Sequence, residues 1–149
     1  NAFENTNESL NTLCSFMHSI ENKKSKYISS TIIQELKTII CRKIYEQAQS
    51  GRLIKNYDPF QVICDWNRWC DQKEVESYLI MVMNKNKEFI ELLMKIIRKS
   101  YDLNSIKTVF DLTELEFKIR ALKESKDFQN LDGETQNSIN YLLEAIAKH

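Results

Sequence analysis

The sequence predicts an all-α fold, on three observations. Glycine occurs twice and proline once in 149 residues, too few turn formers for a β-sandwich, a barrel or an array of hairpins. Apolar residues recur at helical spacing along almost the whole chain. Hydrophobic residues make up 42% of a chain of one-domain length, which suffices for a sizeable core. We therefore expect a single bundle of six or seven helices with orthogonal or irregular packing and, because no fixed-period repeat is visible, no regular solenoid.

The first helix is expected over residues 7–20, followed by an exposed polar loop over residues 21–27. The second helix opens at Ser30 or Thr31, because Thr31 and the glutamine three residues later match a capping box. It runs to Gly51, a residue suited to the position just past a helix end. The apolar faces consist of Leu10, Leu13, Cys14, Met17 and Ile20 in the first helix and of Ile32, Ile33, Leu36, Ile39, Ile40 and Ile44 in the second.

Three further helices are expected to begin at Asp58, at Asp71 and near Lys87. Asp58 can cap a helix whose first position is the proline that follows it. Asp71 ends one helix and caps the next, with an acidic residue three positions later near the positive end of the helix dipole. A polar break over residues 84–86 separates the fourth helix from the fifth, which ends near Lys99. The apolar faces consist of Phe60, Val62, Ile63, Trp66 and Trp69, then Val75, Tyr78, Leu79, Val82 and Met83, then Phe89, Leu92, Leu93, Ile96 and Ile97.

The last part of the chain is expected to hold two more long helices. Residues 101–110 are less periodic and predict one short helical turn over residues 105–109. Asp111 has a capping pattern for the sixth helix and Asp132 for the final one, with a loop over residues 125–132 between them. The apolar faces consist of Leu115, Phe117, Ile119 and Leu122 in the sixth helix and of Ile139, Leu142, Leu143 and Ile146 in the final one.

The four cysteines predict reduced thiols rather than a metal site. No Cys-x-x-Cys pair occurs, and only two histidines accompany the cysteines, so the close ligand pairs of a structural zinc site are missing. Two disulfides are the alternative, but a helical, core-rich chain packs free cysteines as small hydrophobes. We therefore expect a cytoplasmic protein with no metal and no cofactor. The cysteines are Cys14, Cys41, Cys64 and Cys70.

We expect neither a leader nor a membrane-spanning segment in this sequence. Its longest apolar run covers residues 78–83, far short of the ~20 residues that cross a bilayer. No charged-then-apolar stretch with a cleavage pattern is present. Asn1 and Ala2 resemble an expression-tag scar. The natural sequence is therefore expected to cover residues 3–149 as one helical domain, a candidate C-terminal piece of a larger protein.

Charge is balanced overall but not locally. Basic and acidic residues number 21 each, which argues against a globally basic nucleic-acid binder and an acidic tail. Residues 22–55 hold eight basic and two acidic residues, a local charge of plus six. This stretch is a candidate docking face, and an ordinary solvated surface is the alternative reading. Nucleic acid is not the favoured partner, because Lys37 and Arg42 are five residues apart and Glu46 follows Arg42 by one turn. The candidate interaction surface consists of Lys23, Lys24, Lys26, Arg42, Lys43, Arg52, Lys55 and Trp69.

Two tryptophans three residues apart, Trp66 and Trp69, lie on neighbouring faces of the third helix. Both rings can pack inward, or one can lie at an interface, and core packing is favoured because aromatic side chains mostly fill space. Arg68 lies between them and is expected to pair with Asp65 or Asp71 on the surface.

Catalysis has little support in this chain. His18 has no cysteine or serine partner that the sequence can assign, and His149 is the last residue. Glu74 and Glu76 are two residues apart on a helix and face different directions, as do Glu114 and Glu116, so neither pair forms an acid–base dyad. Neither glycine belongs to a phosphate-binding loop. We expect the chain by itself not to be an enzyme.

From Tyr57 onward, the order of features resembles the helical C-terminal region of KAP-family P-loop NTPases of bacteria. The matching residues are 63–69 (Ile-Cys-Asp-Trp-Asn-Arg-Trp), 71–75, the helix with Phe89 and Leu92, residues 106–115 and the closing helix. In that family the region follows the ATPase core and carries no Walker residues. The resemblance therefore implies an accessory helical module of a nucleotide-driven switch, whose nucleotide and magnesium ligands lie upstream of this chain.

Three functional hypotheses remain. The first is a non-catalytic helical module of a larger P-loop NTPase that contacts the ATPase core or a sibling subunit. The second is a free-standing adaptor whose groove accepts an amphipathic helix, with an exposed apolar strip near Trp69, Met81 or Met83. The third is a helical nucleic-acid binder that uses residues 23–55.

Overall fold

The computed structural model describes residues 10–23 and 28–149, and every regular element in these ranges is a helix, which confirms the all-α prediction. Seven of the helices have 11 or more residues, in agreement with the expected number of long helices. These are α1 (Leu10–Lys23), α2 (Ser30–Gln49), α4 (Pro59–Trp69), α5 (Gln72–Met83), α6 (Asn86–Arg98), α8 (Leu112–Lys123) and α10 (Gly133–Ala147). Three four-residue helices lie between them: α3 (Leu53–Asn56), α7 (Leu103–Ile106) and α9 (Lys126–Gln129).

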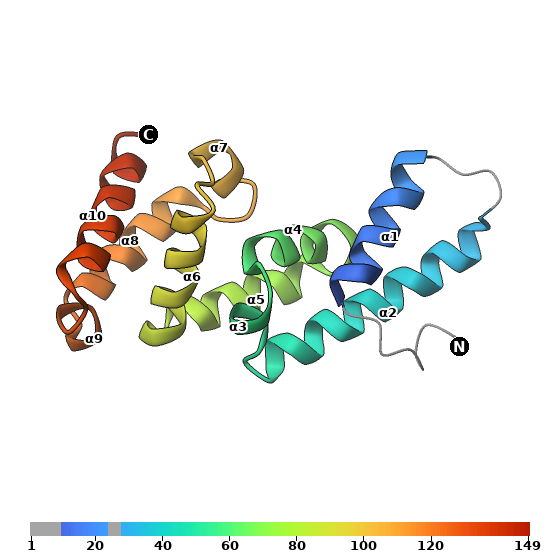
Figure 1. The fold of residues 1–149 in the computed structure, drawn as a ribbon, viewed down its shortest axis with the longest axis horizontal. Helices are drawn as coiled ribbons and strands as arrows, with labels where there is room; N and C mark the ends of the chain where they lie inside the picture. The colour runs from blue at the N-terminus through green and yellow to red at the C-terminus, as the bar shows by residue number, and fades with distance from the viewer. Residues whose placement is uncertain (1–9, 24–27) are drawn as a thin grey trace.

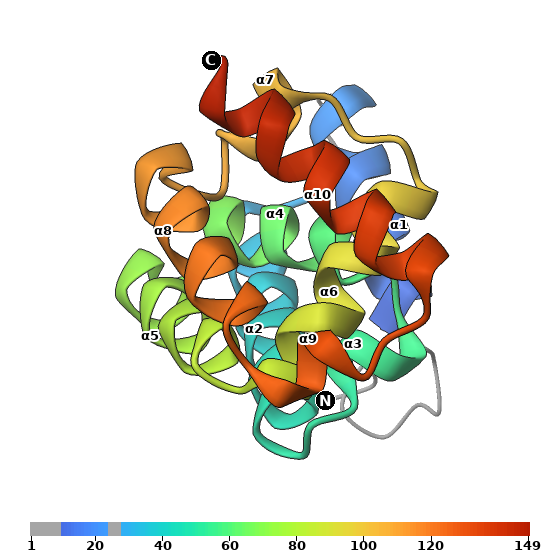
Figure 2. The ribbon, with the colours of Figure 1, turned by 90° about the vertical axis from the view of Figure 1, so that its left-hand side faces the viewer.

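The helices follow one another along the long axis of the molecule (Figure 1). The α1–α2 pair forms one end, α8, α9 and α10 form the other, and α4, α5 and α6 lie between. Helix α4 packs against α2, α5 and α6, and α6 in turn packs against α9 and α10. Seen along the long axis, α8 and α10 are in front and α5 lies on the same side as α8 (Figure 2). One continuous set of buried apolar side chains from these helices forms the core.

Most helix starts are set by local capping, as the sequence predicts. Asp58, Asp71, Asp111 and Asp132 are N-caps whose carboxylates each accept a hydrogen bond from a backbone N–H of the first turn. The expected capping box at the start of the second helix is wrong. The N-cap there is Ser29, whose hydroxyl accepts from the N–H of Ile32, so α2 begins one residue after it.

Gly51 lies just past the end of α2 with a φ of 76°, in the left-handed region that favours glycine. The C-cap residue before it is Ser50, so Gly51 occupies the predicted C′ position. A side chain at position 51 would be strained there even though space is available for a Cβ atom. This glycine turns the chain from α2 into α3.

Two short helices were missed by the sequence analysis, because four residues cannot show a helical period. In both cases a side chain from another helix caps the short one. Lys95 of α6 donates from Nζ to the carbonyls of Ile54, Lys55 and Tyr57 at the end of α3. The expected loop over residues 125–132 contains α9, whose last carbonyls accept from Nε2 of Gln136 in α10. The short turn expected over residues 105–109 lies slightly earlier, as α7.

The pKa of Asp132 is lowered by hydrogen bonds from the Thr135 side chain and backbone, and the pKa of Asp102 by bonds from Ser105. A carboxyl whose folded pKa is depressed stabilises the fold above its unfolded pKa of about 3.9, and this contribution disappears as the pH falls through the folded pKa. We expect the double variant Asp102→Asn/Asp132→Asn to keep both caps, with a weaker loss of stability below about pH 4. Urea unfolding at a series of pH values from pH 7 to pH 2 measures the free energy of unfolding of both proteins. The same decrease of this free energy with falling pH in variant and wild type would argue against the prediction.

The prediction of four reduced thiols is wrong for one pair of cysteines. Cys41 of α2 and Cys70, the C-cap residue of α4, form a disulfide with a Cα–Cα distance of 5.9 Å. The packing of α2 against α4 brings together two residues that are 29 positions apart, which the sequence spacing does not reveal. Cys14 and Cys64 are free thiols. Because disulfides are rare in cytosolic proteins, the cysteines no longer favour a cytoplasmic location.

Candidate functional site

A buried carboxylate connects α1 to α4. Asp65 is 4% exposed and is the one charged side chain buried in the described part of the chain. His18 of α1 lies with Nε2 at 2.7 Å from Asp65 Oδ1, and Gln61, one turn earlier in α4, donates from Nε2 to the same oxygen at 3.4 Å. A buried carboxylate needs such partners, because leaving it without them costs far more than the partners contribute. This contact across 47 residues fixes α1 on α4.

Cys14 lies one turn before His18 on α1, and Asp65 acts on its thiol as well. Burial raises the pKa of the Cys14 thiol to about 12, and the negative charge and hydrogen bond of Asp65 act in the same direction. The thiol is therefore protonated at neutral pH, whereas a nucleophilic or metal-binding cysteine needs a thiolate. Cysteine, histidine and aspartate are thus close together here, but they do not form a nucleophilic triad.

The reactivity of the Cys14 thiol shows whether the thiol is protonated and buried in solution. We expect the Cys14 thiol of the folded protein to react with iodoacetamide at pH 8 much more slowly than a free cysteine, because it is both protonated and buried. Unfolding in urea is expected to restore the ordinary rate. Mass spectrometry of the labelled peptide measures both rates, with the unfolded chain as the control. Rapid labelling of folded Cys14 would show that the thiol is activated.

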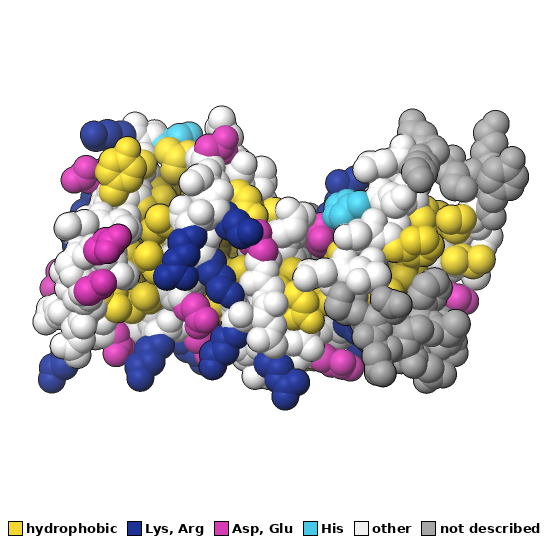
Figure 3. Space-filling model, in the orientation of Figure 1, with side chains coloured by type: hydrophobic (Ala, Val, Ile, Leu, Met, Phe, Trp, Pro, Cys, Tyr) yellow, Lys and Arg dark blue, Asp and Glu magenta, His cyan; other side chains and the backbone are white. Residues whose placement is uncertain are grey.

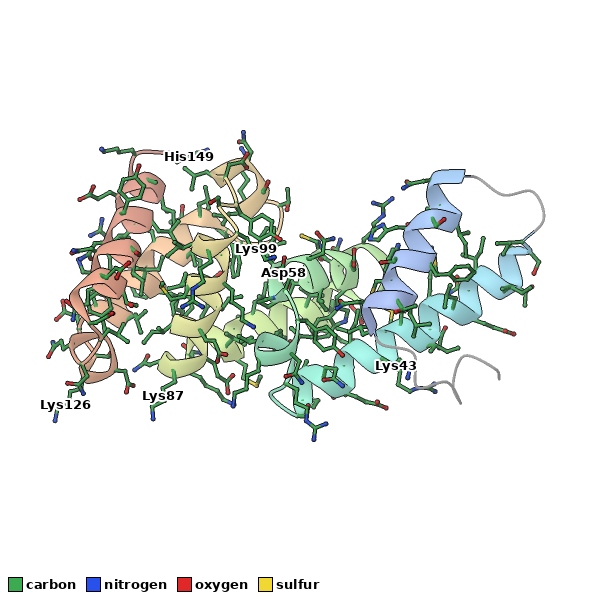
Figure 4. All side chains as sticks on the ribbon, viewed as in Figure 1. Lys43, Asp58, Lys87, Lys99, Lys126 and His149 are labelled. Carbon is green, nitrogen blue, oxygen red and sulfur yellow. A yellow bond between two sulfur atoms is a disulfide. The ribbon has the colours of Figure 1, made fainter. Side chains whose placement is uncertain are left out.

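An open cleft of about 330 Å³ lies over this cluster. Asp58, the N-cap of α4, lies in the middle of the molecule (Figure 4) and accepts at Oδ2 from the hydroxyl of Tyr101 at 2.6 Å. The cleft has two carboxylates, an imidazole and two amides in its wall, and no lysine or arginine is among the described residues that line it. The bonds of His18 and Gln61 to Asp65 connect α1 to α4, and the bond of Tyr101 to Asp58 connects α4 to the segment after α6. The lining residues are Asn11, Cys14, Ser15, His18, Asp58, Gln61, Val62 and Asp65.

Both tryptophans of α4 are buried, as the favoured reading predicted. Trp66 is 1% exposed and Trp69 9%, so Trp69 is not an exposed anchor of the candidate interaction surface. The Trp69 ring lies 4.7 Å from the His18 ring between centroids, and its Nε1 donates to Glu21 Oε1 at 3.0 Å. The expected pairing of Arg68 with Asp65 or Asp71 is wrong. Arg68 Nε lies 3.5 Å from the same Glu21 oxygen, because Asp65 is turned inward to His18.

The basic residues expected to form a docking face are only partly described. Arg42, Arg52 and Lys55 are exposed and Lys43 is half-buried, whereas Lys24, Lys26 and the side chain of Lys23 lie outside the described residues. Lysines and arginines lie along the lower edge of the face in Figure 3, with carboxylates among them. Figure 4 places Lys43 of α2, Lys87 of α6 and Lys126 of α9 along this edge. The basic side chains there therefore come from the whole length of the molecule, and their charge is mixed with acidic groups.

An apolar groove lies between α5 and the start of α8. Its volume is about 320 Å³, and Leu79, Ile80 and Met83 line it from α5. Val109 and Phe110, which precede α8, line the other side. Three carboxylates complete the lining: Glu76 of α5, Asp111 and Glu114. The groove thus combines apolar side chains with an acidic rim, and its lining holds no basic residue.

The exposed apolar strip lies elsewhere than the sequence suggested. Met83 is buried and Met81 half-buried, whereas Ile80, the residue before Met81, is 48% exposed. The helical period of α5 places Ile80, and not Met81, on the side that faces solvent. The large hydrophobic residues that are exposed in the described ranges are Phe16, Ile32, Tyr45, Ile80, Phe117 and Tyr141.

In residues 10–23 and 28–149, no three histidine, cysteine, aspartate or glutamate side chains are grouped so that they could hold a metal ion. Of the helices in those ranges, none combines the length and the apolar character needed to cross a membrane.

Comparison with known proteins identifies no relative. The sequence matches no family model, no curated protein and no solved structure. The resemblance to KAP-family NTPases therefore stays a prediction.

Proposed function

We propose that the chain is a non-catalytic helical module of a larger bacterial P-loop NTPase of the KAP type, and that it acts through protein contacts. The observation that carries the proposal is the α5–α8 groove, a preformed apolar surface left open on a folded helical domain. Its partner would be the ATPase core of the parent chain or a sibling subunit, in the cytoplasm.

The position of the KAP-like residues in the fold supports this proposal. Residues 63–69 form most of α4, where Ile63 and Trp66 are almost fully buried. Asp71 caps α5 directly after it. Helix α4 packs against three other long helices, so the residues that resemble the family build the centre of the module rather than a peripheral segment.

The proposal is tested by the complete gene and its product. A reading frame that continues upstream into a P-loop with a Walker lysine is expected, together with NTP hydrolysis by the full-length protein. A full-length variant with that lysine replaced is the control for hydrolysis. A gene that starts near Phe3, without any upstream Walker lysine, would overturn the proposal.

The same groove also favours the second hypothesis, a free-standing adaptor that binds a partner helix. The two functions differ in the length of the gene product and not in the surface used. The gene test therefore separates them, since an adaptor needs no nucleotide-binding region.

A further inference from the structure

The α5–α8 groove has the features of a site for apolar anchor side chains. Leu79, Met83 and Phe110 are buried and form the base of the groove, and Ile80 beside them is half exposed. Its volume, about 320 Å³, is at the lower end of the ~300–1,000 Å³ range of ligand pockets. A groove of this size admits a few side chains of a docked segment.

The two walls of the groove are held together independently of any partner. Lys118 of α8 donates from Nζ to Oδ1 of Asn84, the C-cap residue of α5, at 2.8 Å. Asp111 accepts from the N–H of Thr113 at 2.9 Å, which fixes the first turn of α8. A groove that is formed before binding does not have to be ordered by its partner, so less free energy is lost on association.

The rim of the groove is acidic. Glu76 and Glu114 are exposed, and Asp111 also lies at the groove. Bringing a neutral or acidic segment over three carboxylates would remove water from them without supplying compensating charges. A segment with lysines or arginines beside its apolar anchors supplies these charges.

Helix α8 extends the apolar surface in the direction of its axis. Phe117 follows Glu114 by three residues, on the same side of the helix, and is 69% exposed. Along α8, Phe117 therefore lies about one helical turn from the groove. This separation suits anchor side chains spaced at i, i+3 and i+4 on a bound helix.

We infer that the α5–α8 groove is the docking site for a basic amphipathic helix, whose apolar face covers Ile80 and Phe117 and whose lysines or arginines face Glu76, Asp111 and Glu114. This inference deepens the proposed function, on which it rests for the assumption that the module acts by protein contacts. It names the surface and the chemistry of the partner. It does not depend on the partner being part of a P-loop NTPase.

The probe is a synthetic amphipathic helical peptide of leucines and lysines, with a matched peptide that carries glutamates in place of the lysines. Binding is measured by isothermal titration, and the surface is mapped by amide chemical shifts of the 149-residue chain. We expect the lysine peptide to bind with shifts confined to α5 and residues 109–117, and the glutamate peptide not to bind.

Two pairs of variants distinguish binding at the groove from non-specific electrostatic or hydrophobic binding elsewhere on the surface. Ile80→Ser and Glu76→Lys are expected to weaken binding of the lysine peptide about tenfold or more, because each removes a contact that binding buries or pairs. Ile32→Ser and Glu46→Lys make the same changes at exposed positions of α2 and are expected to leave it unchanged. Circular dichroism checks that all four variants fold.

Several outcomes would overturn the inference. These are an absence of binding by the lysine peptide, equal binding of both peptides, or equal effects of Ile80→Ser and Ile32→Ser. Concentration-dependent dimerisation that Ile80→Ser abolishes would assign the groove to a second copy of this chain instead. None of these results bears on the upstream Walker lysine, so a failure here is distinct from a failure of the proposed NTPase origin.

Discussion

Reduction of the Cys41–Cys70 disulfide is expected to lower the free energy of unfolding by about 3–4 kcal/mol. The bond closes a loop between residues 29 positions apart and ties α2 to the end of α4. Without it the unfolded chain gains conformational freedom, whereas the folded chain keeps the same helix packing. Urea unfolding of the protein with and without a reducing agent measures the difference.

The double variant Cys41→Ser/Cys70→Ser separates the disulfide from other effects of the reductant. Its stability is expected to equal that of the reduced wild type and not to respond to reductant, because Cys14 and Cys64 are free thiols. A cytoplasmic setting would keep this pair reduced, so the reduced value is the relevant one there. If reduction leaves the unfolding curve of the wild type unchanged, the disulfide does not contribute to stability in solution.

Replacement of Trp66 by alanine is expected to cost about 3–5 kcal/mol of stability. The Trp66 ring is almost fully buried in α4 and lies 5.5 Å from the Tyr78 ring of α5 between centroids. Alanine leaves a large cavity where α4 packs against its neighbours. Within residues 10–23 and 28–149, nothing accepts a hydrogen bond from Trp66 Nε1, so we attribute the role of this tryptophan to packing.

This role makes a second, graded prediction at the same position. Trp66→Phe keeps an aromatic ring and gives up no hydrogen bond, and it is expected to cost only about 1–2 kcal/mol. The control is Phe117→Ala, which removes a ring that is 69% exposed and is expected to change stability by no more than about 0.5 kcal/mol. Equal losses for Trp66→Phe and Trp66→Ala would indicate that the indole makes a specific polar contact. Urea unfolding followed by circular dichroism measures all three variants.

The sequence predicts what is decided locally. The starts at Asp58, Asp71, Asp111 and Asp132 are correct because a capping carboxylate bonds a backbone N–H only two or three residues away. The buried faces of the long helices follow from the helical period in the same way. The all-α fold class therefore needs no tertiary information.

What the sequence does not predict depends on contacts between distant residues. The partners of the disulfide are 29 residues apart, Lys95 reaches the end of α3 across about forty residues, and His18 meets Asp65 across 47. One signal for the last contact is visible in the sequence. Asp65 follows Val62 by three residues and precedes Trp69 by four, so it lies on a buried face of α4.

The α5–α8 groove also depends on contacts between residues that are distant in the sequence. Ile80 and the acidic residues on α5 are visible in the sequence, but the segment over residues 109–114 that completes the groove is brought to them by tertiary packing. The helical period places Met83 on the buried face of α5 and leaves Ile80 and Met81 off that face, but it does not show which of these two is the more exposed. The apolar strip was expected near Trp69, Met81 or Met83, but Trp69 and Met83 are buried and the exposed large hydrophobic residue of α5 is Ile80.

Amide hydrogen exchange on the complete gene product, compared with the 149-residue chain alone, tests most directly whether the module works by docking through this groove. The docking account predicts that amides of α5 and residues 109–117 become more protected in the complete protein. A full-length Ile80→Ser variant should lose that added protection, and Ile32→Ser should keep it. Unchanged exchange over the groove, with new protection only around Lys43 and Lys55, would contradict it.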